Sequence, residues 1–196
     1  MNSPPSPQEW LAPVIPLRRG TISAPRAVDG APTDESTEST EYNSAMDLAM
    51  KYLGPRARSR REVGDRLQKA GHPGVLIVRI LNRLEELGIL DDAAYALEAA
   101  RQNRARGKAG RAVRQALATK GLSRADIDSA VDQMCPEGSE FDLALAIATK
   151  RALKYEGLPA ATAWRRLAGF LAGRGFSSEL TSEICSRVLR DFPEGD

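Results

Sequence analysis

From about residue 44 onward, apolar residues recur at the three- and four-residue spacing of helices. The clearest stripe lies within residues 75–87 and comprises Leu76, Ile77, Ile80, Leu81, Leu84 and Leu87. Such spacing places apolar side chains on one helical face, whereas a half-buried strand would alternate apolar and polar residues. No stretch of useful length shows that alternation, so the pattern predicts an all-α fold.

Capping residues divide this helical pattern into elements. Ser44 is expected to cap a helix that runs to about Leu53. Ser59, followed three residues later by Glu62, has the spacing of a capping box and predicts a helix to about Ala70.

A Leu-x-x-x-Gly motif recurs three times, each time at a predicted helix end. The motifs are Leu67–Gly71, Leu117–Gly121 and Leu171–Gly175, with glycines 50 and 54 residues apart. Glycine suits the left-handed backbone that commonly ends a helix. Nine positions past each glycine comes an apolar residue: Ile80, Ala130 and Ile184. We therefore predict three equivalent three-helix modules, at residues 45–91, 92–140 and 141–196.

Residues 1–44 differ from the rest of the chain. They contain seven prolines and the polar run TDESTESTEY, with three basic and six acidic groups. Such a segment buries too little apolar surface to offset its ordering entropy, so we predict a disordered tail. The apolar patch at residues 10–15 is either a docking motif or a stray patch in this tail.

Composition adds a charge asymmetry to the picture. Residues 45–196 hold twenty-five basic and twenty acidic groups, a net charge of +5, against −3 for residues 1–44. Nucleic acid or an acidic protein groove is a plausible partner for a basic helical array. The alternative is an arginine-rich surface with no specific partner.

The basic residues gather in three clusters that are candidate binding sites. The middle cluster has no acidic residue among its members, which repel one another until an external anion such as phosphate relieves them. The first cluster is diluted by Glu62 and Asp65, so a solvated helix face is its alternative interpretation. The candidate residues are Arg101, Arg104, Arg106, Lys108, Arg111 and Arg114 in the middle cluster, Arg58, Arg60 and Arg61 in the first, and Lys150 and Arg174 in the third.

Residues typical of catalysis are nearly absent. His72, the single histidine, lies in a turn, and Cys135 and Cys185 stand 50 positions apart without a CxxC pair. Gly107–Gly110 lacks the spacing of a phosphate-binding loop. Asp91 and Asp92 are better explained as a helix start than as a metal pair. We expect no enzyme activity, cofactor, structural metal or disulfide.

The remaining expectations concern packing and location. Cys185 is predicted to be a small core residue, and the aromatics Trp164, Phe170 and Phe176 are also predicted to belong to the core. The sequence contains no signal peptide and no apolar run of about 18 residues, as a membrane span needs. We therefore expect a monomeric cytoplasmic protein with no membrane contact.

Several of these stretches together resemble the RecX family of bacterial recombination regulators. They are residues 59–63 with Leu67 and Gly71, residues 84–96, residues 101–107 with 110 and 117–121, and residues 174–177. The likeness covers about residues 45–190. It departs from the family at Gln115, where an acidic residue is frequent, and in residues 1–44, which have no counterpart.

The resemblance implies a curved, elongated array of three tandem modules. It also implies a regulator that binds RecA–single-stranded DNA filaments and suppresses strand exchange and ATP hydrolysis in recombination and the SOS response. Duplex DNA is a further non-specific partner to consider. Two alternatives remain at this point: a helix-turn-helix transcription factor, and a helical-repeat scaffold that binds only proteins.

Overall fold

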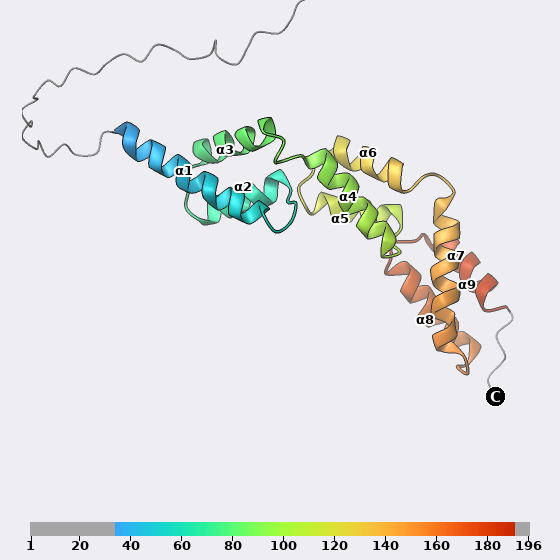
Figure 1. Ribbon diagram of the computed structural model, residues 1–196. Coiled ribbons are helices and arrows are strands. Elements are labelled where there is room, and N and C mark those ends of the chain that lie inside the picture. The colour runs from blue at the N-terminus through green and yellow to red at the C-terminus, as the bar shows by residue number, and fades with distance from the viewer. Residues whose placement is uncertain (1–33, 191–196) are drawn as a thin grey trace, which may run out of the picture.

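The computed structural model describes residues 34–190, and in this part of the chain it contains nine α-helices, one short 3-10 turn and no strand. The helices form three groups of three that follow one another in an elongated row with a bend (Figure 1). This confirms the predicted all-α fold of three tandem three-helix modules. Most of the predicted disordered tail falls on residues 1–33, which lie outside the described residues.

The helices repeat in the same order in each module. The first module contains α1 (Asp34–Leu53), α2 (Arg60–Lys69) and α3 (Gly74–Glu86); the second contains α4 (Asp92–Ala105), α5 (Gly110–Ala118) and α6 (Arg124–Met134); the third contains α7 (Ser139–Ala152), the 3-10 turn Leu153–Tyr155, α8 (Ala160–Ala172) and α9 (Ser178–Val188).

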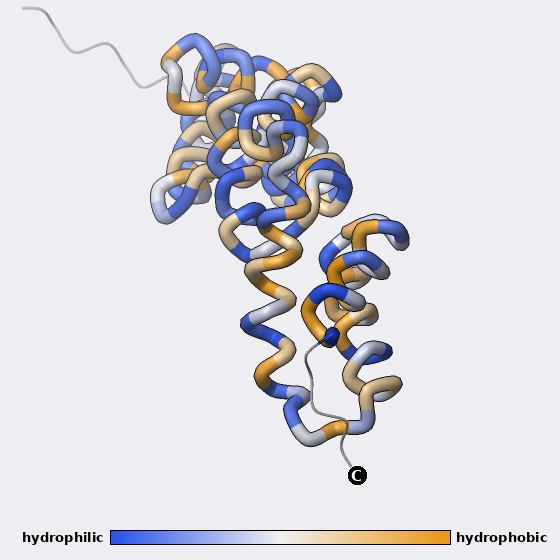
Figure 2. Tube along the Cα trace, turned by 90° about the vertical axis from the view of Figure 1, so that its right-hand side faces the viewer, coloured by the Kyte–Doolittle hydropathy of each residue, from blue (hydrophilic) through white to orange (hydrophobic). Residues whose placement is uncertain are grey.

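Each module has its own apolar core, and the three cores share a plan. The first helix of each module buries alanines, whose small side chains let its partners approach closely: Ala45 and Ala49, Ala96 and Ala100, Ala144 and Ala148. The second helix supplies larger residues against them: Val63 and Leu67, Val113 and Leu117, Leu167 and Leu171. Apolar and polar residues are interspersed along each helix (Figure 2). This pattern is expected where a helix buries only one of its faces.

Helix starts and ends follow the sequence signals. Ser59 and Glu62 form a complete capping box at the start of α2, and Ser123 and Ser177 cap α6 and α9 through their side chains. The glycines of the three Leu-x-x-x-Gly motifs have φ angles of 89°, 74° and 87°. The predicted left-handed helix ends are thus confirmed.

Helix α1 begins ten residues earlier than Ser44, where we predicted its start. The polar residues of this extension have partners on α3 and in the turn before it. The Glu38 carboxylate accepts a hydrogen bond from Arg79 at 3.0 Å, and the Arg79 guanidinium lies 4.9 Å from the centre of the Tyr42 ring. His72 Nδ1 is 4.0 Å from the Glu41 carboxylate. These contacts attach the extension of α1 to α3 and to the turn that precedes α3.

The predictions about packing are confirmed in part. Cys185 is fully buried, and burial raises the pKa of its thiol to about 11, so it is an unreactive core residue. Phe176 is also buried, and Phe170 packs against the same core. The prediction for Trp164 is wrong, because 42% of this side chain is exposed.

Candidate functional site

The middle basic cluster follows the end of α4, a short loop and the start of α5. Arg101, Arg106, Arg111 and Arg114 are exposed, whereas Arg104 and Lys108 are partly buried. The cluster lies where the second and third modules meet. Some of its side chains are therefore exposed to solvent, and others make contacts within this junction.

Arg104 belongs to the junction. Its guanidinium donates hydrogen bonds to the Ser139 hydroxyl at 2.6 Å and to the Ser139 carbonyl at 2.9 Å. It also donates to the carbonyl of Lys108 at 3.4 Å. Because these acceptors lie on the loop and on the first residue of α7, Arg104 ties the second module to the third and is less available to an external anion.

Arg101 and Arg114 pair with carboxylates of their own module. Arg101 lies 2.8 Å from Glu98, one turn earlier on α4, and the pKa of Glu98 is lowered by hydrogen bonds from Gln102 and from Arg101. Arg114 on α5 forms an ion pair with Asp128 on α6. An exposed pair such as Arg101–Glu98 contributes little stability, so Arg101 can exchange its partner for a phosphate.

Besides Arg104, whose guanidinium is hydrogen-bonded to Ser139, three cations of this cluster form no ion pair among residues 34–190: Arg106, Lys108 and Arg111. Arg106 ends α4, Lys108 lies in the loop and Arg111 is the second residue of α5. We call these three residues the middle basic surface. Their charges are not neutralised by nearby carboxylates, which suits them to an anionic partner.

The first cluster is mostly engaged within the protein. Arg60 contacts Glu85 at 2.5 Å and Asn82 at 2.7 Å, which links α2 to α3. The guanidinium of Arg58 stacks on Tyr52, 4.7 Å from the ring centre. Arg61 is exposed, and its closest carboxylate contact is a long one, 3.9 Å to Asp65.

The third cluster is dispersed. Lys150 is exposed on α7. Arg174 is partly buried, with its guanidinium 3.7 Å from the centre of the Phe170 ring. Its backbone carbonyl accepts a hydrogen bond from Ala109 N–H at 3.0 Å. Arg174 is thus part of the junction between the second and third modules.

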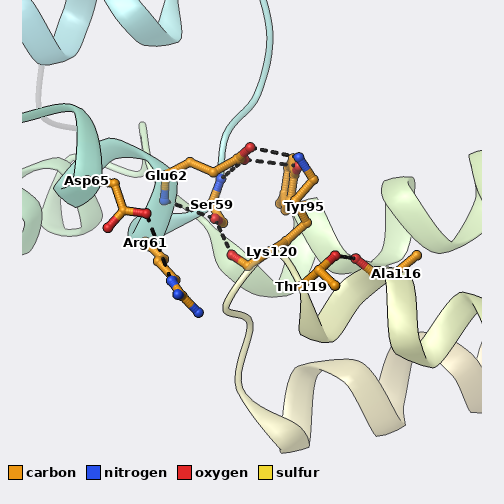
Figure 3. Close-up of polar contacts among 8 residues, drawn as sticks. All are labelled: Ser59, Arg61, Glu62, Asp65, Tyr95, Ala116, Thr119 and Lys120. Carbon is orange, nitrogen blue, oxygen red and sulfur yellow. Dashed lines mark hydrogen bonds and ion pairs between the residues drawn. The ribbon is translucent and has the colours of Figure 1, made fainter.

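A second polar site, which the sequence did not indicate, joins the first module to the second. The Ser59 hydroxyl donates to the Lys120 carbonyl at 2.7 Å, while Lys120 Nζ reaches the Glu62 carboxylate at 2.7 Å. The Tyr95 hydroxyl donates to the same carboxylate at 3.2 Å. Figure 3 shows Glu62 beside Ser59, Tyr95 and Lys120, which come from three different helices or helix ends. We call Ser59, Glu62, Tyr95 and Lys120 the first junction.

The charges of the first junction stabilise each other. Burial raises the pKa of the Glu62 carboxyl, but hydrogen bonds from Lys120, Ser59 and Tyr95 outweigh burial and leave that pKa below its ordinary value. The hydrogen bond to Glu62 raises the pKa of Lys120. Burial, followed by the Glu62 charge, raises the pKa of Tyr95. At neutral pH Glu62 and Lys120 therefore form an ion pair, and the neutral Tyr95 hydroxyl donates a hydrogen bond to Glu62. These polar groups have their partners within the protein.

In the part of the chain that the structure describes, the side chains that could bind a metal ion are dispersed. Among residues 34–190, no group of three or more histidine, cysteine, aspartate or glutamate side chains is placed to hold a metal ion. Within the same range, none of the helices is both long enough and apolar enough to cross a bilayer. The features that stand out are the middle basic surface and the polar junctions between modules.

These features define the class of protein: an elongated array of three-helix modules that meet at polar junctions. Three family models match it in order, described as the first, second and third three-helix domains of RecX, at residues 45–84, 91–131 and 139–185. This chain belongs to the RecX family.

Curated relatives and solved structures agree with this assignment. The chain is 31% identical over 176 residues to the regulatory protein RecX of Streptomyces lividans, covering 89% of this chain and 90% of the relative. It is 35% identical over 156 residues to that of Mycobacterium avium (strain 104), covering 78% and 89%. A crystal structure of regulatory protein RecX superposes with a TM-score of 0.68 at 26% identity, covering 81% of this chain and 79% of that one.

A second solved structure supports the fold alone. The crystal structure of RecX from Lactobacillus salivarius has a TM-score of 0.63 at 21% sequence identity, and the match covers 76% of this chain and 97% of that one. The match extends over nearly all of that chain, so the row of three modules is common to both proteins.

Proposed function

We propose that this chain is a cytoplasmic, non-enzymatic regulator that binds RecA–single-stranded DNA filaments and suppresses strand exchange and ATP hydrolysis. Curated relatives at 31% and 35% identity are named regulatory protein RecX. The observation that carries the proposal is the middle basic surface, three cations without carboxylate partners on a row of modules. An elongated array can contact several subunits of a polymer together with its nucleic-acid backbone.

The mechanism that we propose is differential binding. A ligand shifts an equilibrium only as far as it prefers one state over the other. An array that spans neighbouring subunits holds them in one relative arrangement and thereby favours one filament state. Suppressed strand exchange and ATP hydrolysis would follow because the filament no longer passes through its other states. Arg106, Lys108 and Arg111 supply the contacts to phosphate, with Arg101 joining them when it leaves Glu98.

The proposal is tested by sedimentation with preformed RecA filaments, together with ATP hydrolysis at substoichiometric amounts of this protein. Reversing the charges of the middle basic surface with Arg106→Glu, Lys108→Glu and Arg111→Glu should lower filament affinity by at least about tenfold. The matched control reverses Lys51, Arg66 and Lys69, which are exposed on the first module. The control changes the net charge by the same amount but leaves the middle basic surface intact, so it should retain filament binding.

Salt dependence identifies the partner within the filament. If phosphates are contacted, the logarithm of the affinity should fall with the logarithm of the salt concentration by about 0.7 per single-strand contact. A flat response would remove DNA from the mechanism and leave a protein-only scaffold. Equal losses in the two charge-reversed variants would contradict a local role for the middle basic surface.

A further inference from the structure

A groove lies between α8 and α9, next to the junction of the second and third modules. It has a volume of about 630 Å³. Its apolar lining comes from α8 and the turn that follows it, namely Trp164, Ala168, Ala172 and Phe176. Ser178, Thr181 and Ser182 line the side formed by α9, and Arg111 of the second module also lines it.

The groove is open because of a small residue. Ala168 lies three positions before Leu171, as Gly64 and Arg114 lie before Leu67 and Leu117. In the second module the equivalent position holds Arg114, which forms an ion pair with Asp128 across α5 and α6. That ion pair spans the space that Ala168 and Ser182 leave open in the third module. A comparable groove in the first module is lined by Gly64, Ile77 and Leu81.

Two groups in the third-module groove are unusual for a surface that stays in water. Trp164 is 42% exposed although it borders an apolar floor. Thr181 is only 6% exposed, and its hydroxyl has no hydrogen-bond partner. An unpartnered buried hydroxyl is costly, and this one lies below the groove surface, where a bound ligand does not contact it.

The charges around the groove are of both signs. Arg111 is exposed, belongs to the middle basic surface and forms no ion pair within the described chain. Glu179 also lines the groove, at the first turn of α9. Hydrogen bonds from its own backbone N–H and from Ser177 and Ser178 lower the pKa of Glu179, so it is ionised at neutral pH. Arg111 attracts an anionic group to the groove, whereas Glu179 repels one.

We propose that this groove takes an unpaired base of single-stranded nucleic acid, stacked on Trp164, with the adjoining phosphate on Arg111. An exposed indole is a stacking platform that every base can use. Ser182, exposed on α9, lines the groove and offers a hydroxyl to the edge of the base, and small residues on α8 leave room for a flat ring. The groove continues the middle basic surface, so one strand contacts both. The inference rests on the proposed function, to which it adds a nucleotide-binding subsite.

Fluorescence offers a direct test, because the chain has two tryptophans. Trp10→Phe leaves Trp164 as the single indole, and the full-length variant is titrated with an oligothymidylate of about 12 nucleotides. The emission should be quenched with saturation. In the parent background, Trp164→Ala should weaken oligonucleotide affinity by about 5- to 100-fold, measured by anisotropy of a labelled strand.

Three further variants separate the contacts. Arg111→Ala should reduce the salt dependence by about 0.7. Ser182→Ala removes an exposed hydroxyl that lines the groove, so it should weaken binding without altering that dependence. Glu179→Gln should strengthen binding, because it removes the repelling charge. Leu153→Ala is the control, since Leu153 is an apolar side chain of the same module, 61% exposed and outside the groove; it should leave binding unchanged.

Two results would overturn the inference. One is oligonucleotide binding without any change in Trp164 emission, which would place the strand elsewhere. The other is quenching by DNA-free RecA but not by free oligonucleotide, which would assign the groove to protein. Filament sedimentation of Trp164→Ala keeps the two proposals apart. Retained sedimentation with weakened oligonucleotide affinity supports both, whereas absent filament binding by the parent protein contradicts only the regulatory proposal.

Discussion

Gly71, Gly121 and Gly175 have the same left-handed backbone but different surroundings. A Cβ atom at Gly175 would lie 2.6 Å from the Cβ of Ala112, and one at Gly121 would overlap the Arg61 side chain. At Gly71 there is nothing within 4 Å. At the two internal junctions glycine is therefore required for two reasons. Its backbone has a positive φ angle, and the second helix of the preceding module leaves no room for a Cβ atom.

This difference gives a prediction at the residue scale. Gly71→Ala should lower the free energy of unfolding by about 1 kcal/mol, the cost of a left-handed alanine. Gly175→Ala pays the same backbone cost and also overpacks the junction, so it should lose about 2–4 kcal/mol. Urea denaturation of both variants measures the comparison. Equal losses would mean that the junction relaxes without cost.

The basic residues show what sequence reasoning resolves at this scale and what it does not. Arg104 and Arg106 are two positions apart in one charged run, and the sequence does not distinguish them. In the structure Arg104 bonds to Ser139, 35 residues away, whereas Arg106 is exposed. Charge clustering located the surface, but the acceptors that engage individual arginines are brought near only by folding.

Between elements, the first junction depends on ionisation. Glu62 has a pKa below its ordinary value of 4.5, so its contribution to stability is present above that value and is lost as pH falls through the lowered pKa. Lys120 has a pKa above 10.5, so its contribution is present below that value and is lost as pH rises through the raised pKa. The junction is therefore most stable between the two ordinary values.

We predict that Glu62→Gln flattens the acid side of the stability profile. The free energy of unfolding of the parent protein should fall more steeply than that of the variant as pH decreases below about 4.5. Urea denaturation at a series of pH values measures both profiles. Asp65→Asn is the control, an exposed carboxylate on the same helix, and it should keep the parent's slope. A parallel profile for Glu62→Gln would refute the assigned ion pair.

The helices could be predicted from the sequence, and the reasons are local. Leucine and glycine at fixed spacing mark helix ends, and Ser59 with Glu62 marks a helix start. The start of α1 could not be predicted, because Glu38 and Tyr42 gain their partner Arg79 only when α3 folds against them. The prediction that Trp164 is buried failed for a similar reason. Trp164 borders the open groove next to Ala168, and this groove forms only when α8 and α9 pack together.

At the scale of the molecule, the same docking arrangement recurs at both junctions. The carbonyl before a left-handed glycine, that of Lys120 or Arg174, accepts a hydrogen bond from the start of the preceding module's second helix. The donors differ, a Ser59 hydroxyl in one case and an Ala109 N–H in the other. Repetition of this contact fixes how successive modules are placed, which gives the row its direction and bend (Figure 1).

The overall shape should therefore respond to the junction side chains. Ser59→Ala combined with Glu62→Gln removes both links to Lys120 and should let the first module move relative to the second. Small-angle X-ray scattering should show a larger radius of gyration and a broader distance distribution. The control, Thr119→Ala, removes an exposed hydroxyl that bonds within α5 to Ala116. An unchanged scattering curve for the double variant would mean that the remaining contacts, which include the hydrogen bond from Arg60 N–H to Asp92, are sufficient to hold the modules.

The early start of α1 bears on how long such a protein can become. Its first turns lie beside Gly71 and His72, the positions equivalent to those through which the later modules receive their predecessors. A duplicated unit inserted upstream of this helix would have to displace these turns before it could dock. A stretch of polar helix thus occupies the surface on which a further module upstream would have to dock.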